Sequence, residues 1–280
     1  MVRNGLIATA LVFMALFLVL PLLIVFTEAL SAGVDAYVSA IANPNVLAAI
    51  WLTLLIAAIA VPANLVFGLC ASWCIARFRF PGRNLLITLI DLPFSISPVI
   101  AGMLQVLLFG LNGLFGPFLA AHNVQIIFAA PGMVLATIFV TFPFVAREVI
   151  PLAQEQGNDE EEAAVTLGAG FFQIFWRVSL PKIRWGLFYG VLLCNARAMG
   201  EFGAVSVVSG KVFGSTDTLP LAVQSLYESY EIQAAFAAAS LLAFLALVTL
   251  TLKAALEWWQ RDEIYAASTR LSSSSRKAAP

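Results

Sequence analysis

Few side chains in this chain could perform acid–base or nucleophilic chemistry. Its 280 residues include one histidine, His122, which stands beside Asn123. A histidine-activated serine or cysteine would need this residue as its base. The sequence contains neither G-x-S-x-G nor H-E-x-x-H, and Val205 replaces the first glycine that a phosphate-binding loop ending at Gly210-Lys211 would require. We therefore expect no catalytic residue and no ATP site in this chain, and we expect His122 in a loop.

The three cysteines do not form a metal site. Cys70 and Cys74 share one helix face, and Cys194 lies in another apolar segment. No histidine or carboxylate stands near them to complete a set of metal ligands. We expect all three to be small buried hydrophobic residues, with no metal and no disulfide.

Two opposite charges, Arg197 and Glu201, occur inside a long apolar segment. They are four residues apart, so their side chains meet on one face of a helix. Near the centre of a bilayer each alone would cost about 2.5–3.5 kcal/mol, so they must be paired or face a cavity. Two roles remain open: a structural ion pair, or a gate whose arginine offers planar hydrogen-bond donors to an oxyanion.

Asp91 is a further charge in apolar sequence, close to Pro93 and Pro98. These prolines remove two backbone donors and loosen a helix. Irregular backbone persists at membrane depth only inside protein or beside water. Asp91 could be structural, in contact with a helix end or a basic residue, or could belong to a pathway. The turn at Ser95, Ser97 and Pro98 could likewise be structural or line a pathway.

The composition places these residues in a membrane protein. The chain is 61% hydrophobic and 11% charged, with a mean hydropathy of +0.94, whereas soluble domains are about 45–50% apolar. The apolar runs are continuous, which disfavours a β-barrel. We predict an all-α polytopic domain over residues 1–261 and a polar, disordered tail over 262–280. About 20 residues span a bilayer, which gives six helices near 6–30, 46–76, 85–109, 128–150, 183–208 and 234–258.

The basic residues give the orientation of these six helices. Lys211 is the only basic residue in the loops of one side. The other side carries Arg3, Arg77, Arg79, Arg83, Arg147, Arg177, Lys182, Arg184, Arg261, Arg270, Arg276 and Lys277. Because basic residues favour the cytoplasmic side, both termini are predicted to be cytoplasmic.

The longest predicted cytoplasmic loop covers about residues 154–182. Asn158 and Asp159 can cap a helix, and the acidic residues 160–162 complement its dipole. Gly168 predicts a bend, and Pro181 predicts the end of a second short helix. The loop also carries large apolar side chains, namely Leu167, Phe171, Phe172, Ile174, Phe175 and Trp176. Such a patch favours a surface that binds another protein, and the alternative is a segment lying flat on the membrane.

The same loop resembles the EAA loop of ATP-binding-cassette importer permeases. The matching residues are Glu162, Ala163, Ala164, Gly168, Leu180 and Pro181, with Val178 where isoleucine is usual. The resemblance implies a type I importer permease fold. It also implies that these residues couple the permease to a separate ATPase subunit, through a helix seated in a cleft of that subunit.

Other stretches resemble the W-type permeases of sulfate/thiosulfate importers. They are Asn195 to Gly210, Asp91 to Phe94, Ser97 to Val99, Pro131 to Val134, and Pro143 to Val145. The resemblance implies a bacterial inner-membrane complex with a T-type permease, two copies of an ABC ATPase and a periplasmic or lipid-anchored sulfate-binding protein. ATP and Mg would bind to the ATPase, and no cofactor would bind to this chain.

Three alternatives remain at this point. Molybdate permeases are similar around Arg197 to Gly203, which leaves molybdate or tungstate as a substrate. A secondary transporter or channel would work without a co-purifying ATPase. An intramembrane protease would cleave peptides and lose activity when a serine or histidine is replaced.

Overall fold

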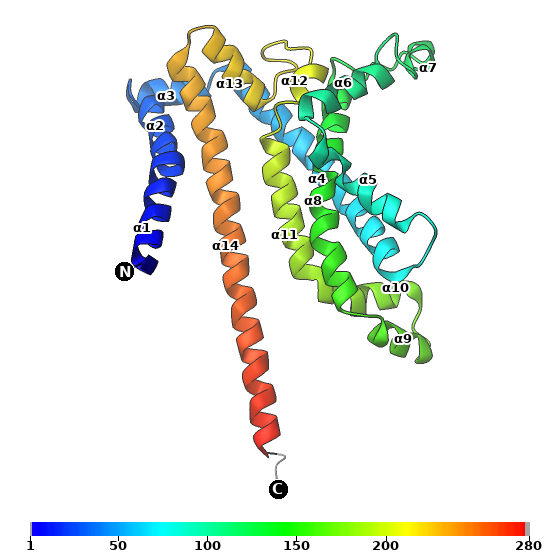
Figure 1. Cartoon of the computed structure of the whole chain (residues 1–280). Coiled ribbons are helices and arrows are strands. Elements are labelled where there is room, and N and C mark those ends of the chain that lie inside the picture. The colour runs from blue at the N-terminus through cyan, green and yellow to red at the C-terminus, as the bar shows by residue number, and fades with distance from the viewer. Residues whose placement is uncertain (1, 278–280) are drawn as a thin grey trace. The chain divides into compact units, whose positions relative to one another are not determined.

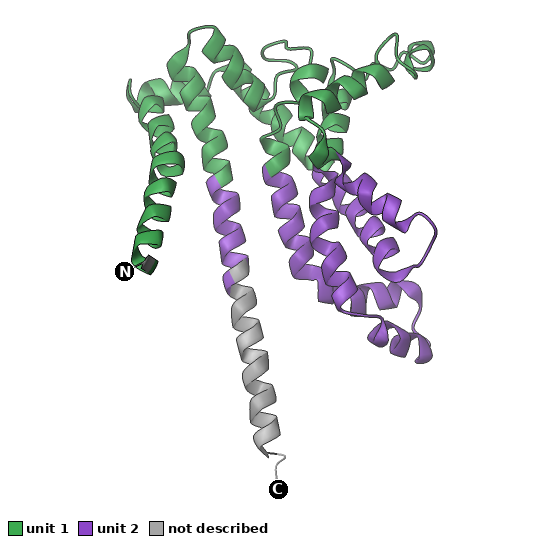
Figure 2. Ribbon diagram, viewed as in Figure 1, with its two compact units in different colours: residues 1–60, 93–140, 197–246 green, residues 61–92, 141–196, 247–280 purple. Residues whose placement is uncertain are grey.

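The computed structural model describes residues 2–277, and the side chains of residues 3–256 and 258. In this part of the chain every regular element is a helix (Figure 1), which confirms the all-α class. The contacts between residues divide the chain into two compact units (Figure 2). Unit 1 comprises residues 1–60, 93–140 and 197–246, and unit 2 comprises residues 61–92, 141–196 and 247–280.

Several helices contribute residues to both units. Unit 1 contains α1 (Val2–Met14), η1 (Ala15–Val19), α2 (Leu20–Ala29), α3 (Val34–Ile41), α6 (Pro98–Phe109), α7 (Gly116–Ala121), α12 (Val205–Val208) and α13 (Leu219–Glu228). Unit 2 contains most of α5 (Arg83–Ser95), α9 (Asp159–Thr166), α10 (Phe171–Ile174), η2 (Phe175–Ser179) and most of α11 (Leu180–Met199). The helices α4 (Pro44–Arg77), α8 (Ala130–Glu155) and α14 (Ile232–Lys277) are divided between the units.

The core of unit 1 is apolar and forms around the short helices α12 and α13. Met133, Val205 and Leu221 belong to one buried cluster, and Val46 and Leu226 belong to a second. The chain turns into α13 at a buried polar contact, where the backbone N–H of Leu219 donates to Thr53 Oγ1 at 2.7 Å. This bond satisfies one of the free amides at the start of a helix.

In unit 2, helices α4 and α11 both approach α8 closely through glycine. A Cβ at Gly68 would lie 2.6 Å from Val145 Cγ1, and a Cβ at Gly190 would lie 3.0 Å from Val145 Cα. Small residues at such crossings allow membrane helices to pack closely. A buried polar bond adds to this packing, because Asn64 Nδ2 donates to Thr141 Oγ1 at 2.7 Å.

Among the described residues, four helices are long and apolar enough to cross a membrane, or five if α5 and α6 form one span. The predicted count of six therefore stays a prediction. The helix expected over 85–109 is broken before Pro98, because the residue before a proline avoids helical backbone. The helix expected over 183–208 ends at Met199, ahead of Gly200 and Gly203. Because it carries Lys182, Arg184 and Arg197, α11 is less apolar than the four.

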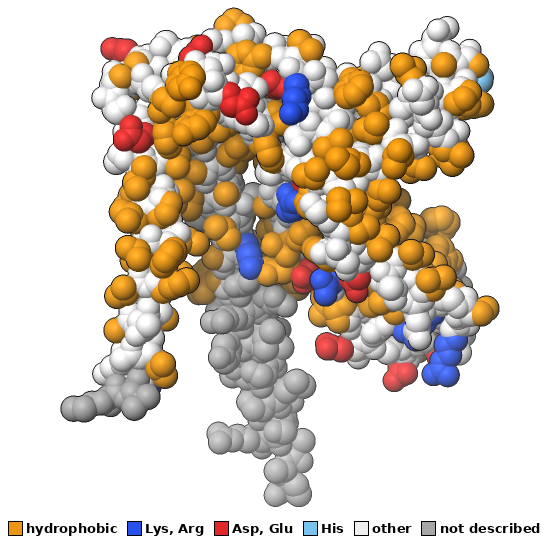
Figure 3. Space-filling view, turned by 45° about the horizontal axis from the view of Figure 1, so that its top comes forward, with side chains coloured by type: hydrophobic (Ala, Val, Ile, Leu, Met, Phe, Trp, Pro, Cys, Tyr) orange, Lys and Arg blue, Asp and Glu red, His pale blue; other side chains and the backbone are white. Residues whose placement is uncertain are grey.

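The last helix extends beyond the predicted membrane segment, and the disorder of the tail stays a prediction. The backbone of α14 continues as a helix through Lys277, and residues 278–280 lie outside the described residues. The sequence contains no glycine or proline between residues 221 and 279, so nothing in its composition breaks the helix that begins in the membrane segment. Hydrophobic side chains cover much of the face shown in Figure 3, as expected for helices surrounded by lipid.

Two π-helical turns, η1 and η2, each precede a Leu-Pro pair. The N–H of Leu20 donates to Ala15 O, and the N–H of Leu180 donates to Phe175 O. The prediction that Pro181 ends the second short helix is therefore wrong, because the chain continues through it into α11. A proline clashes with the carbonyl four residues earlier, and the wider π turn moves that carbonyl away.

Candidate coupling site

The predicted coupling loop begins with α9, which carries four acidic residues in its first turn. Asn158 occupies the N-cap position as expected, but its side chain makes no capping bond, because its Oδ1 accepts from Arg77 instead. Gly168 follows the helix with a φ of +82°. No atom lies within 4 Å of a Cβ placed there, so the glycine serves the bend and not a close approach.

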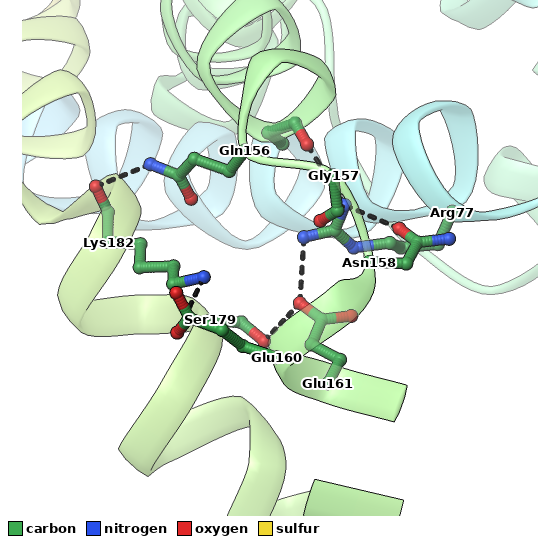
Figure 4. Close-up of polar contacts among 9 residues, drawn as sticks. Arg77, Gln156, Gly157, Asn158, Glu160, Glu161, Ser179 and Lys182 are labelled. Atoms are coloured by element: carbon green, nitrogen blue, oxygen red, sulfur yellow. Dashed lines mark hydrogen bonds and ion pairs between the residues drawn. The ribbon is translucent and has the colours of Figure 1, made fainter. Parts of the chain in front are cut away.

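Arg77, the last residue of α4, holds the base of this loop (Figure 4). Its Nη1 donates to Gly157 O and Asn158 Oδ1, each at 2.8 Å, and to Ala153 O at 3.0 Å. Its Nη2 forms an ion pair with Glu161 Oε1 at 2.7 Å. The guanidinium thereby joins the ends of α4 and α8 to the first turn of α9.

A second set of contacts ties the loop to the start of α11. Lys182 Nζ pairs with Glu160 Oε2 at 2.7 Å, and the carbonyl of Lys182 accepts from Gln156 Nε2 at 2.9 Å (Figure 4). Ser179 Oγ donates to Glu161 Oε1 at 2.6 Å. Both sides of the loop are therefore bound to each other by polar contacts.

The outward surface of the loop is apolar, and we call it the aromatic surface. Its exposed members are Val165, Leu167, Phe171, Phe172 and Trp176. Leu167 is 88% exposed and Phe172 75% exposed. Ile174 was expected on this surface but is buried, because its position on α10 faces the interior. Phe175 is half-buried, with its ring 5.4 Å from that of Trp73.

The structure places the predicted coupling residues on two parts of the loop. Glu162, Ala163 and Ala164 lie on α9, and Leu180 and Pro181 begin α11. Sequence reasoning missed the buried contacts beneath them, which involve Arg77, Glu161 and Ser179. The available signal was the position of Arg77 at the predicted cytoplasmic end of an apolar helix, opposite an acidic segment.

In unit 1 the predicted pair of charges is present. Arg197 Nη1 lies 2.7 Å from Glu201 Oε2, although α11 has already ended at Met199. Glu201 Oε1 also accepts from the backbone N–H of Ala204 at 2.8 Å. The carboxylate is 1% exposed and the Arg197 side chain 33% exposed. The ion pair therefore links the last turn of α11 to the non-helical segment that follows it.

The turn before α6 lies against the same break. A Cβ at Gly203 would be 2.9 Å from Pro98 Cβ, and a Cβ at Gly102 would be 2.6 Å from Ala204 O. Only glycine at these positions permits this distance between backbones. Ser97, next to Pro98, is exposed. A role of Ser97 and Pro98 in lining a pathway stays a prediction.

Asp91 belongs to unit 2 and contacts a basic residue, as expected. Its Oδ1 lies 3.4 Å from Arg147 Nε, and both side chains are about half exposed. The pair links α5 to α8. The structure thus brings Arg197 and Glu201 together in one unit and gives Asp91 a separate partner in the other.

Two further predictions concern single residues. His122 lies at the exposed end of α7, with its Nδ1 2.8 Å from Phe118 O. Cys194 is buried, but Cys70 and Cys74 are exposed, so the expectation that all three are buried is wrong for two. An apolar sequence does not distinguish a lipid-facing side of a helix from a protein-facing side. Among the described residues no group of three or more potential metal ligands occurs.

Comparison with known proteins shows the family to which this chain belongs. Residues 64–261 match the family described as the binding-protein-dependent transport system inner membrane component. The chain belongs to this family of multi-pass integral membrane permeases. A bacterial ABC transporter involved in the import of the acidic polysaccharide alginate has a similar fold, with a TM-score of 0.74 over 93% of this chain and 95% of that chain at 18% identity.

Among its relatives are sulfate permeases. The sulfate transport system permease protein CysW of Synechocystis is 58% identical over 91% of this chain and 93% of its own length. CysW of Escherichia coli is 53% identical over 87% of this chain and 84% of its own length. The sulfate transport system permease protein CysT of Salmonella typhimurium is 38% identical over 86% of this chain and 87% of its own length.

Proposed function

We propose that this chain is a permease subunit of an ATP-driven sulfate/thiosulfate importer that depends on a binding protein. The observation that carries the proposal is its 58% and 53% identity to two sulfate permeases over nearly their whole length. The Arg197–Glu201 pair, in which the carboxylate is buried and the arginine is one-third exposed, is consistent with a charged pathway for an oxyanion.

The surface of the coupling loop favours a partner subunit that hydrolyses ATP. Its aromatic surface exposes large apolar side chains on a segment that is predicted to be cytoplasmic. Polar contacts beneath this surface hold the loop in one conformation, which reduces the entropic cost of binding. We propose that a separate ATPase subunit covers the aromatic surface, and that ATP and Mg bind to that subunit.

The proposed complex contains a second permease of the T type, because CysT from Salmonella typhimurium is also similar to this chain. Two ATPase copies, one for each permease, and a sulfate-binding protein on the outer side complete it. We place the complex in the inner membrane of a bacterium, with both termini of this chain in the cytoplasm. Alternating access would then move one permease against the other around the route of the anion.

Reconstitution tests this proposal. The tagged chain is co-expressed with the T-type permease, the ATPase and the sulfate-binding protein, then purified and placed in liposomes. We expect all subunits to co-purify, and radiolabelled sulfate to enter only with ATP. A matched complex without the ATPase should transport nothing. Uptake without the ATPase would favour a secondary transporter, and uptake of molybdate but not sulfate would refute the substrate.

Labelling of introduced cysteines tests the orientation. Thr166→Cys on α9 should react with a membrane-impermeant maleimide only from the cytoplasm, and Lys211→Cys only from the outside, in a background that lacks the exposed Cys70 and Cys74. Both positions are exposed. Reaction of Lys211→Cys from the cytoplasm would contradict the predicted topology.

A further inference from the structure

We propose that Arg77 is a positioning residue for energy coupling, which fixes the coupling loop to the ends of α4 and α8 so that they move as one body with the loop. The inference rests on the proposed function, since it concerns how motion of an ATPase would reach the membrane helices. Its evidence is the set of contacts that one guanidinium makes within unit 2.

The guanidinium donates to four acceptor atoms. Three oxygen atoms, Ala153 O, Gly157 O and Asn158 Oδ1, lie within 3.0 Å of Nη1, which carries two hydrogens. Ala153 is in the last turn of α8, and Gly157 follows that helix. The positive charge therefore satisfies carbonyls at the end of α8 and complements its dipole.

The ion pair to the loop is shielded from solvent. The Arg77 side chain is 8% exposed and that of Glu161 13% exposed. The Arg77 guanidinium also lies over the ring of Trp73, 5.7 Å from its centroid, which adds a cation–π contact. Salt weakens a shielded pair less than a surface pair, so the contact persists at cellular ionic strength.

The contacts continue from α9 to the start of α11. Glu161 Oε1 accepts from both Arg77 Nη2 and Ser179 Oγ, and Ser179 is buried. This single oxygen therefore connects the end of α4 with η2, which leads directly into α11. A force on the aromatic surface of the loop would act on α4, α8 and α11 together.

Arginine has a property here that lysine lacks. A guanidinium presents two amino groups in a fixed plane, whereas an ammonium is a single point charge. Arg77→Lys keeps the charge but cannot reach the α8 carbonyls and Glu161 with the same geometry. The variant therefore separates positioning from simple charge balance, and Arg79→Lys is its matched control, because Arg79 lies two residues away with an exposed side chain.

Two measurements on the complete complex test the proposal. The first is amide hydrogen exchange of residues 159–168 in the nucleotide-free complex. We expect exchange there to be about tenfold faster in Arg77→Lys and unchanged in Arg79→Lys, because loss of the contacts raises the population of locally opened states. This measurement does not depend on which substrate is transported.

The second measurement is the amount of sulfate transported per ATP hydrolysed in liposomes. We expect this ratio to fall about tenfold in Arg77→Lys, which is within the usual range for coupling between sites, while ATPase still co-purifies. If Arg77→Lys does not assemble, Ser179→Ala removes one contact of the same oxygen and should lower the ratio by a smaller factor.

The outcomes distinguish this inference from the proposed function. Faster exchange together with a lower ratio supports the positioning role. Unchanged exchange would overturn it, and so would faster exchange with an unchanged ratio. If the unmodified complex hydrolyses ATP but moves no sulfate, the proposed function fails, and the hydrogen-exchange result alone then supports or overturns the attachment of the loop by Arg77.

Discussion

Replacement of Arg197 or Glu201 should have unequal costs, because the two side chains are buried unequally. Glu201 is 1% exposed, its Oε2 forms an ion pair with Arg197 Nη1 at 2.7 Å, and its Oε1 accepts a hydrogen bond from the Ala204 N–H at 2.8 Å. Arg197→Met leaves the buried carboxylate without its counter-charge, a loss that typically costs about 3–5 kcal/mol. Native proteins are stable by only about 5–15 kcal/mol, so this variant should assemble poorly.

Glu201→Gln should be milder. The amide oxygen can still accept from the Ala204 N–H, and Arg197 is one-third exposed. The variant then loses only the ion pair, and the remaining charge on Arg197 can reach solvent, so the cost should be smaller than that of an unpaired buried carboxylate. The double variant removes both charges and should be more stable than Arg197→Met by about 2 kcal/mol or more, because removing both partners leaves no unpaired charge.

We would measure complex yield and thermal unfolding of the purified permease pair for both single variants and the double variant. Comparison of these three variants with the unmodified pair gives the interaction energy between the two residues. If the stability lost in the double variant equals the sum of the losses in the two single variants, the ion pair does not stabilise the fold. Uptake is measured beside stability. If the assembled double variant transports sulfate at the full rate, the pair is structural only; little transport indicates that Arg197 also meets the anion.

Three further predictions concern the loops. Phe172→Asp on the aromatic surface should abolish co-purification of the ATPase while leaving membrane insertion intact, whereas the same change at exposed Phe118 on α7 should not; retained ATPase binding would argue against the docking surface. Gly168→Ala should cost only about 1–2 kcal/mol, because its φ of +82° is unfavourable for a side chain but no atom obstructs a Cβ; a total loss of folding, measured by yield, would contradict this. Burial raises the pKa of Asp217 in the loop before α13, against the opposing effects of Ser225 and Lys211. The folded state then binds the proton more tightly than the unfolded state. The contribution of Asp217 to the free energy of unfolding is therefore complete below its unfolded pKa and is lost as the pH rises through its folded pKa. Asp217→Asn should flatten the pH dependence of the unfolding temperature above about pH 4, and an unchanged profile would refute the raised pKa.

Much of the coupling loop could be predicted from the sequence. Acidic residues before an alanine-rich turn indicated α9, and Gly168 indicated the bend, since both signals act within a few residues. The position of Arg77 opposite an acidic segment was a signal for an ion pair, but the full set of its contacts could not be predicted, because Ala153 and Glu161 are about 80 residues away in the chain. Two of the three acceptors of Nη1 are backbone carbonyls, which carry no sequence signal.

Prediction of the membrane segments from the sequence was limited in a different way. Apolar composition predicted the presence of helices but not their breaks. The interruption before Pro98 and the end of α11 at Met199 depend on close contacts of Gly102 and Gly203 with distant backbone. Arg197 and Glu201 were expected to meet on a continuous helix, and they meet although that helix has ended. Their attraction was predictable from charge, whereas the local geometry depends on tertiary packing.

The π turn at η2 determines the direction in which the side chains before it point. Each residue of an α-helix rotates the chain by about 100°, and a π turn holds one residue more than an α turn. Phe171 and Phe172 precede this turn. If all the present residues formed a uniform α-helix continuous with α11, their side chains would be turned about the α11 axis by about 100° from the present direction. Deletion of one residue of 175–179 other than Trp176 would remove the extra residue and restore an α turn, so Phe171 and Phe172 would keep their direction. The rotational phase that the π turn sets is therefore part of the specificity of the proposed docking surface.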